Sequence, residues 1–257
     1  MADLSGRVAL VTGAGSGIGK VIAIDIANSG AVVLTCGRRK ELLDQTISAF
    51  PDSAEGKAYA ADLTDPSATE KLTAEVTADH GAIDILVNNA GFSSKVRSAR
   101  FVGSEEWQGV MEVNTLGPVV LTKALLPGMI EKQRGDVVMI SSLAGLRPNV
   151  MAGAAYSAAK AAARAYMEVL YSEVRRYGIR CTTIFPGEVD TPILDNRALP
   201  PDEEARATMM QPEDISAVVM TALQLPQRAT VLELSIGATE PRDMGPDIKA
   251  ALTKEFL

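Results

Sequence analysis

The feature that most constrains the fold is a glycine-rich segment close to the N-terminus. A short apolar run, residues 7–12 (R-V-A-L-V-T), leads directly into residues 13–19 (G-A-G-S-G-I-G), and Ile18, Ile22 and Ile26 then recur at helical spacing. This pattern predicts a strand, a tight turn and a helix. Glycines in the turn let a pyrophosphate approach the first turn of the helix, where exposed amides and the helix dipole favour an anion. We therefore expect dinucleotide contacts from Gly13, Ser16, Gly17, Ile18 and Gly19.

The rest of the chain alternates apolar runs with helical patterns. The length of 257 residues is enough for one sizeable core, and the 47% of hydrophobic residues, only 4% aromatic, suit a parallel sheet flanked by helices. We predict a doubly wound α/β Rossmann domain with a seven-stranded parallel sheet, spanning residues 1–257. The expected strands after the first are residues 31–36, 57–61, 83–87, 136–140, 179–185 and 230–236, and the expected helices after the first are residues 40–50, 66–80, 104–114, 117–132, 154–177 and 212–224.

The end of the second predicted strand carries the signal for the cofactor. Gly37 leaves empty the position at which an acidic residue would accept hydrogen bonds from a free ribose 2′-hydroxyl, and Arg38 and Arg39 follow it. Guanidinium groups offer charge-assisted donors to a 2′-phosphate. The sequence therefore favours NADP over NAD, and the alternative is a pair of solvated arginines ahead of a helix.

Other strand ends supply further cofactor candidates. Asp62, followed by Leu63, is placed either to meet an adenine amino group or to act as a helix cap or turn residue. Small and amide-bearing residues follow the fourth strand and suit contact with the cofactor, and the turn after the sixth strand is expected to pass over the nicotinamide. These candidates are Asn89, Ala90, Gly91, Pro186, Gly187, Val189 and Thr191. A change of composition predicts a mobile lid around residues 190–211.

Tyr156 and Lys160 lie four residues apart in an alanine-rich segment that we expect to be helical, so both side chains share one face. An ammonium beside a tyrosine favours the phenolate and lowers the pKa of the tyrosine, which then exchanges protons with an alcohol or a ketone. A hydroxyl at Ser142 is placed to hold the same oxygen, and Asn114 is expected to hold a helix kink and a water. The pair taken alone would also fit an ordinary surface helix.

Composition excludes several classes of function. A formal net charge of −7 argues against nucleic acid or an anionic membrane as the main partner, and no segment is expected to span a bilayer. The only two cysteines, Cys36 and Cys181, are interpreted as buried reduced thiols, which suggests a cytoplasmic protein. His80 is the only histidine, so neither a Ser-His-Asp triad nor a histidine-rich metal site is expected, and no metal is assigned.

In this order and spacing the motifs resemble the short-chain dehydrogenase/reductase family over nearly the whole chain. They are T-G-A-G-S-G-I-G at 12–19, N-N-A-G at 88–91, Asn114, Ser142, Tyr156-x-x-x-Lys160 and P-G-E-V-D-T at 186–191. The resemblance implies a nicotinamide cofactor, an Asn-Ser-Tyr-Lys catalytic set and dimers or tetramers built on the helices of residues 107–132 and 154–177. Ser16 departs from the basic residue of many NADP-using relatives, and L-S-I-G-A-T near the C-terminus departs from the 3-oxoacyl carrier-protein reductases.

The functional expectation is an NADP(H)-dependent enzyme that interconverts a carbonyl and a secondary alcohol of the small ketone, aldehyde or 3-hydroxy acid class. The alternatives are a 3-oxoacyl-thioester reductase, an NAD-linked enzyme and a non-catalytic NADP sensor. Expected pocket residues are Phe92, Leu143, Leu146, Arg147, Glu188, Ile193 and Leu194. Arg147 or Arg197 would either attract a substrate carboxylate or lie in solvent.

Overall fold

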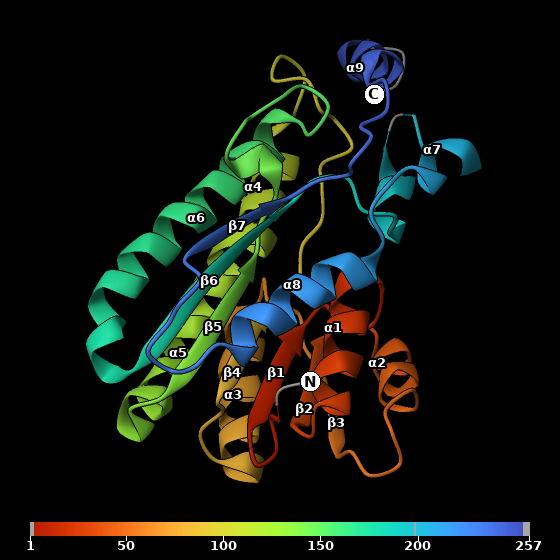
Figure 1. Cartoon of the computed structure of the whole chain (residues 1–257). Coiled ribbons are helices and arrows are strands. Elements are labelled where there is room, and N and C mark those ends of the chain that lie inside the picture. The colour runs from red at the N-terminus through yellow and green to blue at the C-terminus, as the bar shows by residue number, and fades with distance from the viewer. Residues whose placement is uncertain (1–2, 198, 254–257) are drawn as a thin grey trace.

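The computed structural model describes residues 3–197 and 199–253, and its centre is a parallel sheet (Figure 1). The sheet has seven strands in the order β3-β2-β1-β4-β5-β6-β7, and every neighbouring pair is parallel, which confirms the predicted Rossmann topology. The strands are β1 (Val8–Thr12), β2 (Val32–Gly37), β3 (Gly56–Ala60), β4 (Ile85–Asn88), β5 (Gly135–Ile140), β6 (Ile179–Pro186) and β7 (Glu233–Ile236).

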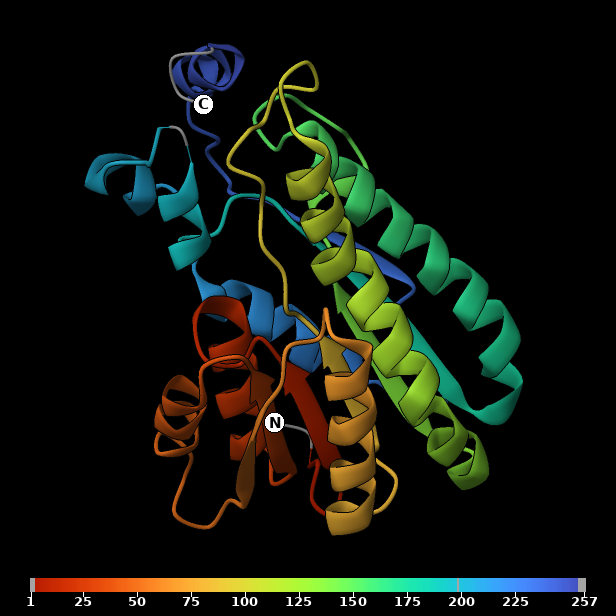
Figure 2. The ribbon, with the colours of Figure 1, turned by 180° about the vertical axis from the view of Figure 1, so that it is seen from behind.

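Helices cover both faces because successive strand residues point to opposite sides. Ala9 and Val11 pack in one buried cluster with α1 and α8, whereas Leu10 packs in a second cluster with α3, α5 and α6. Figure 2, the view from behind, shows the helices α3, α5 and α6 that cover the face of the sheet opposite to α1 and α8. The helices are α1 (Gly17–Asn28), α2 (Lys40–Ile47), α3 (Pro66–His80), α4 (Ser104–Met111), α5 (Gly117–Lys132), α6 (Ala154–Val174), α7 (Glu203–Ala207), α8 (Pro212–Gln224) and α9 (Gly245–Leu252).

Several predicted boundaries were wrong by a few residues. The helix expected to reach residue 50 ends at Ile47, and the last strand begins at Glu233 instead of residue 230. Strand β7 is short because, within the described residues, it pairs only with β6, through residues 183–186. Register with the neighbouring strand, which no local pattern encodes, therefore sets its length.

The segment from Ser104 to Lys132 is one continuous helical rod. A π-helical turn, Glu112–Leu116, joins α4 to α5 without a break. The rod is long and apolar enough to cross a membrane by length and composition alone, with a mean hydropathy of 1.3 over its best window, a test that the core helix of a soluble protein also passes. Here the rod packs against α3 and α6 as a core helix does, and the test is weak evidence of a membrane span.

Part of the C-terminal tail returns to the carboxyl edge of the sheet. After β7 the chain passes along the carboxyl edge of the sheet and forms α9, which lies at the same end of the molecule as α7 (Figure 1). Residues 237–244 contribute to the wall of the cleft described below. Of the predicted lid, residue 198 lies outside the described residues.

Candidate active site

A cleft of about 620 Å³ follows the carboxyl edge of the sheet. It is lined by the turns after all seven strands, which is where open α/β sheets bind ligands. The predicted residues that line it are Gly13, Ser16, Gly17, Ile18, Arg38, Arg39, Asp62, Leu63, Asn89, Ala90, Gly91, Ser142, Tyr156, Lys160, Pro186, Gly187, Val189 and Thr191. The topology thus brings together in one cleft residues drawn from most of the chain.

The glycine-rich turn packs closely against neighbouring backbone because its glycines have no side chains. Gly13 has a φ of +65°, and a Cβ there would lie 2.9 Å from the Cα of Ala90. Gly19 does not line the cleft; it packs inward, where a Cβ would come within 2.3 Å of the Asn89 amide nitrogen. Gly19 is therefore a packing position that lets α1 approach β1 and β4, and its contact with a cofactor stays a prediction.

The turn is braced by the residues that follow β4. The Thr12 hydroxyl accepts hydrogen bonds from the backbone N–H groups of Asn89 and Ala90, both at 3.0 Å, and the Asn89 side chain donates to the Thr12 carbonyl at 3.0 Å. These hydrogen bonds hold the glycine turn against the end of β4 at the base of the cleft.

Arg38 and Arg39 are exposed at the rim of the cleft. Within the described residues neither arginine takes part in an ion pair, so both guanidinium groups are available to a phosphate. Asp62 acts as a turn residue, since its Oδ1 accepts hydrogen bonds from the backbone N–H and the hydroxyl of Thr64 at 3.0 and 2.8 Å. The cap of α3 is supplied by Asp65 instead.

Helix α6 carries Tyr156 and Lys160 to the centre of the cleft. The loop after β5 lies so close to this helix that a Cβ on Gly145 would come within 2.9 Å of the Lys160 carbonyl. The Ser141 hydroxyl also donates to that carbonyl at 3.2 Å. This close packing explains the alanine-rich sequence of α6 and brings Ser142 beside Tyr156.

Lys160 is 4% exposed, and its ammonium donates to the Ile140 carbonyl at 2.9 Å. Burial lowers its pKa to about 8. The ammonium lies 5.5 Å from the centre of the Tyr156 ring. A proton on this side chain is therefore easily lost close to neutral pH.

Tyr156 has a raised pKa, in contrast to the prediction that Lys160 lowers it. Burial is the main cause, and the Ser142 hydroxyl together with Arg97 and Arg197 opposes it. Desolvation outweighs these interactions because the phenolate, unlike the phenol, loses most of its solvation in the interior. Tyr156 is thus held as the neutral phenol.

Asn114 lies in the π-helical turn, at the position where the sequence predicted a helix kink. Its amide donates to the carbonyls of Phe92 and Val110 at 2.8 and 2.9 Å, which leaves Oδ1 buried without a partner. A Cβ on Gly91 would lie 2.6 Å from that oxygen and 3.4 Å from the Lys160 nitrogen. Asn114 does not line the cleft itself; it lies behind Gly91 and presents an acceptor towards Lys160.

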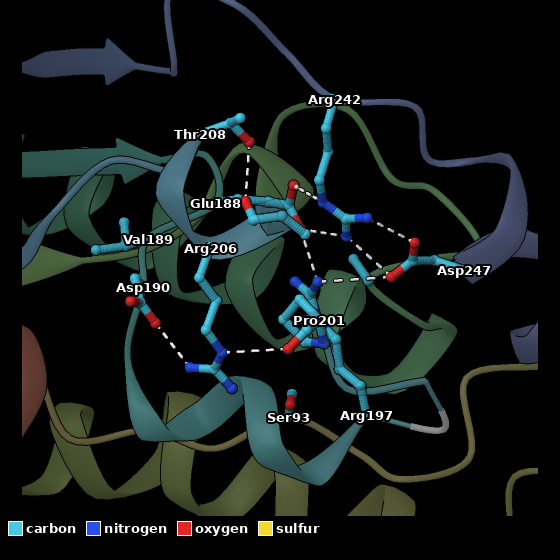
Figure 3. Close-up of polar contacts among 12 residues, drawn as sticks. Ser93, Glu188, Val189, Asp190, Arg197, Pro201, Arg206, Thr208, Arg242 and Asp247 are labelled. Carbon is cyan, nitrogen blue, oxygen red and sulfur yellow. Dashed lines mark hydrogen bonds and ion pairs between the residues drawn. The ribbon is translucent and has the colours of Figure 1, made fainter. Parts of the chain in front are cut away.

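A network of ion pairs closes one side of the cleft (Figure 3). Glu188 accepts from Arg197 at 2.6 Å and from Arg242 at 3.0 Å, and Arg242 also pairs with Asp247 of α9 at 2.8 Å. All four side chains are at most 14% exposed. The network joins the turn after β6, the segment before α7 and the C-terminal tail.

Most, but not all, of the residues expected in the substrate pocket line the cleft. Leu146 and Arg147 do not line the cleft, whereas Phe92, Leu143, Glu188, Ile193, Leu194 and Arg197 do. Sequence reasoning missed Ser93, Arg97 and Arg242. No short motif marks them, because they line one cleft only after the loop between β4 and α4 and the C-terminal tail fold over the same edge of the sheet.

The parallel sheet, the glycine turn at its switch point and the Ser-Tyr-Lys cluster at its carboxyl edge define a dinucleotide-binding oxidoreductase. Residues 7–201 match the family model for short chain dehydrogenases, and the chain belongs to this family. An uncharacterized oxidoreductase of Staphylococcus aureus (strain USA300) is 33% identical over 238 residues, which cover 92% of this chain and 99% of that protein.

Two solved structures resemble the fold closely. The closed form of serine dehydrogenase complexed with NADP+ has a TM-score of 0.84 at 31% identity, covering 93% of this chain and 98% of that one. The alcohol dehydrogenase of the archaeon Thermococcus sibiricus, complexed with 5-hydroxy-NADP, has a TM-score of 0.83 at 26% identity and covers 92% and 98%.

Proposed function

We propose that this oxidoreductase uses NADP(H) to interconvert a carbonyl and a secondary alcohol of a small molecule. The observation that carries the proposal is the placement of Tyr156 and Lys160 from α6 and Ser142 from the turn after β5 in one cleft with a glycine-rich dinucleotide turn. A non-catalytic NADP sensor would need the glycine turn but not these side chains.

The residues of the cleft fit the cofactor. The turn at Gly13 and Gly17 would receive the pyrophosphate at the start of α1, and the exposed Arg38 and Arg39 would bind the 2′-phosphate, which favours NADP over NAD. Val189 and Thr191 would lie beside the nicotinamide. When bound there, the nicotinamide supplies or accepts the hydride.

The side chains manage the proton. Tyr156, kept neutral by burial, donates its phenolic proton to the substrate oxygen during reduction and takes it back during oxidation. Ser142 orients the same oxygen. Lys160 replaces the lost proton, and the unpaired Asn114 oxygen holds a water that links Lys160 to solvent.

The test is replacement of Tyr156 by Phe. General acid–base catalysis contributes roughly 10²–10⁴-fold, so we expect kcat with NADPH and any accepted ketone, aldehyde or keto acid to fall by that factor. Binding of NADPH, followed by fluorescence and compared with NADH, should stay close to that of the wild type. Tyr171→Phe, a matched change on the same helix outside the cleft, should leave kcat unchanged. Retained turnover in Tyr156→Phe would refute the assignment.

We further propose a cytoplasmic homo-oligomer. Both cysteines are buried free thiols whose pKa burial raises to about 12, which suits a reducing compartment. Large apolar side chains stand exposed on the helices that the family resemblance assigns to subunit contacts: Trp107, Leu116 and Val169, at 38%, 55% and 58%. A second copy of this chain would cover them.

A further inference from the structure

Arg97 is a buried arginine whose charge the cleft does not neutralise. It lies in the loop between β4 and α4, is 6% exposed and lines the cleft. Its guanidinium donates to the Ala152 carbonyl at 2.8 Å and to the Ser93 hydroxyl at 3.1 Å. Across residues 3–197 and 199–253 it forms no ion pair, and the oxygens that accept its hydrogen bonds are both neutral.

The charges of the other two arginines that line this side of the cleft are neutralised by carboxylates. Arg197 and Arg242 share Glu188 and Asp247, so two positive and two negative charges cancel. Glu106 of α4 accepts hydrogen bonds from the backbone N–H groups of Lys95 and Val96, and within the described residues it forms no ion pair with Arg97. An unpaired charge is therefore left inside the cleft.

Burying such a charge without a counterion is costly, and burial lowers the pKa of Arg97 to about 10. A site that holds an uncompensated guanidinium beside open volume is prepared to receive an anion. The charge is also close to the chemistry, since Arg97 and Tyr156 perturb each other's titration. The loop is fixed to the start of the catalytic helix, because the Ala154 N–H donates to the Arg97 carbonyl at 3.2 Å.

We propose that Arg97 binds the carboxylate of the substrate, so that the protein acts on a small keto acid or hydroxy acid whose reacting carbon lies near its carboxylate. The proposal rests on the carbonyl–alcohol chemistry proposed above and names its substrate class. Arg97 would use its remaining N–H donors, and Ser93, whose oxygen already accepts from Arg97, would donate its own hydroxyl proton to the carboxylate.

This assignment differs from the two arginines that the sequence suggested. Arg147 is exposed and outside the cleft, and Arg197 is already held by Glu188. Neither offers a buried, uncompensated charge. Arg97 is the residue of the three that a carboxylate would stabilise most.

The first experiment uses the wild-type enzyme with NADPH. We would compare kcat/KM for 3-oxobutanoate and for its methyl ester and amide, which keep the carbonyl but lack the charge, and repeat the comparison with a 2-keto acid and its ester. We expect the acid to be favoured roughly 30-fold or more, because a buried charge would otherwise stay unpaired. Malonate should compete with the acid substrate.

The second experiment compares variants. Arg97→Gln should lower kcat/KM for the acid roughly 30-fold or more, mainly through KM, and so remove the preference for acid over ester. Arg97→Lys should restore part of the preference. Arg147→Gln, which removes an exposed arginine outside the cleft, should leave the preference intact. Circular dichroism reports whether each variant folds. If Arg97→Gln does not fold, the Arg97→Lys variant and the wild-type comparison of acid, ester and malonate still test the role of Arg97.

The outcomes separate the two proposals. Equal turnover of acid and ester by the wild type, or an unchanged preference in a folded Arg97→Gln variant, overturns the role of Arg97 and leaves the oxidoreductase assignment in place. Absence of turnover with every acid, ester, ketone and aldehyde, with either NADPH or NADH, overturns the proposed function itself.

Discussion

The protonation of a single lysine couples chemistry to stability in this protein. Lys160 is 4% exposed, and its ammonium donates a hydrogen bond to the Ile140 carbonyl. Burial moves its pKa from 10.5 to about 8, which corresponds to about 3 kcal/mol of destabilisation of the charged form in the folded state. Functional groups are often held at such a cost to the fold.

We therefore expect Lys160→Met to inactivate the enzyme and yet to raise the free energy of unfolding at pH 7 by about 1–2 kcal/mol. The estimate is smaller than the full pKa effect because the Ile140 carbonyl loses its donor. Urea unfolding monitored by circular dichroism measures it. A variant less stable than the wild type at pH 7 would contradict this account.

The pH dependence has a definite sign. The folded-state pKa of Lys160 is lowered, so between about pH 8 and pH 10.5 the unfolded chain binds more protons than the folded one, and wild-type stability gains with rising pH. The advantage of Lys160→Met should accordingly shrink across this interval and stay constant below it. Urea titrations at pH 7, 9 and 10 would follow the change.

At the scale of elements, the ion-pair network connects the C-terminal helix to the wall of the cleft. Asp247 of α9 is 7% exposed and binds Arg242, which in turn binds Glu188 after β6. Burial alone would raise the pKa of Asp247, but the Arg242 guanidinium outweighs it and the pKa is lowered. The carboxylate thus helps to hold the tail against the cleft above about pH 4, and this contribution fades as the pH falls further.

Replacement of Asp247 by Asn should release this tail without unfolding the sheet. Removing one partner of a buried ion pair costs roughly 3–5 kcal/mol, and the loss should be local because only the tail and the cleft wall depend on the pair. Hydrogen exchange read by mass spectrometry should show faster exchange in residues 237–252 and unchanged exchange in β1 and β4. Lys249→Gln removes an exposed charge from the same helix and should change neither; equal protection in both variants would argue against the network as the anchor.

At the scale of the whole molecule, the proposed self-association follows from where apolar surface remains. Val169 lies on the exposed face of α6 with 58% of its surface accessible, whereas the opposite face of the helix packs on α4 and the sheet. Val169→Glu should dissociate the oligomer, as measured by light scattering coupled to size-exclusion chromatography, while Val169→Ala should not. A wild-type protein that is monomeric at micromolar concentration would refute the proposal.

Much of the fold was predictable because its signals are local. The strand–glycine–helix pattern at residues 7–28 and the helix that begins at Pro66 each depend on residues close in sequence, and the structure confirms both. The interpretation of the two cysteines as buried thiols was also right. The length of β7 and the end of α2 were not predicted, because pairing and packing with distant segments set them.

The sequence by itself determined the class of fold and the main residues of the cleft, because hydrophobic periodicity and glycine turns act over a few neighbouring positions. Only the tertiary structure decided which charges in the cleft are compensated. It paired Arg197 and Arg242 with Glu188 and Asp247 and left Arg97 without a carboxylate, and it raised the pKa of Tyr156 through burial. The physical reason is that desolvation and ion pairing depend on which segments meet in space, and these partners lie far apart along the chain.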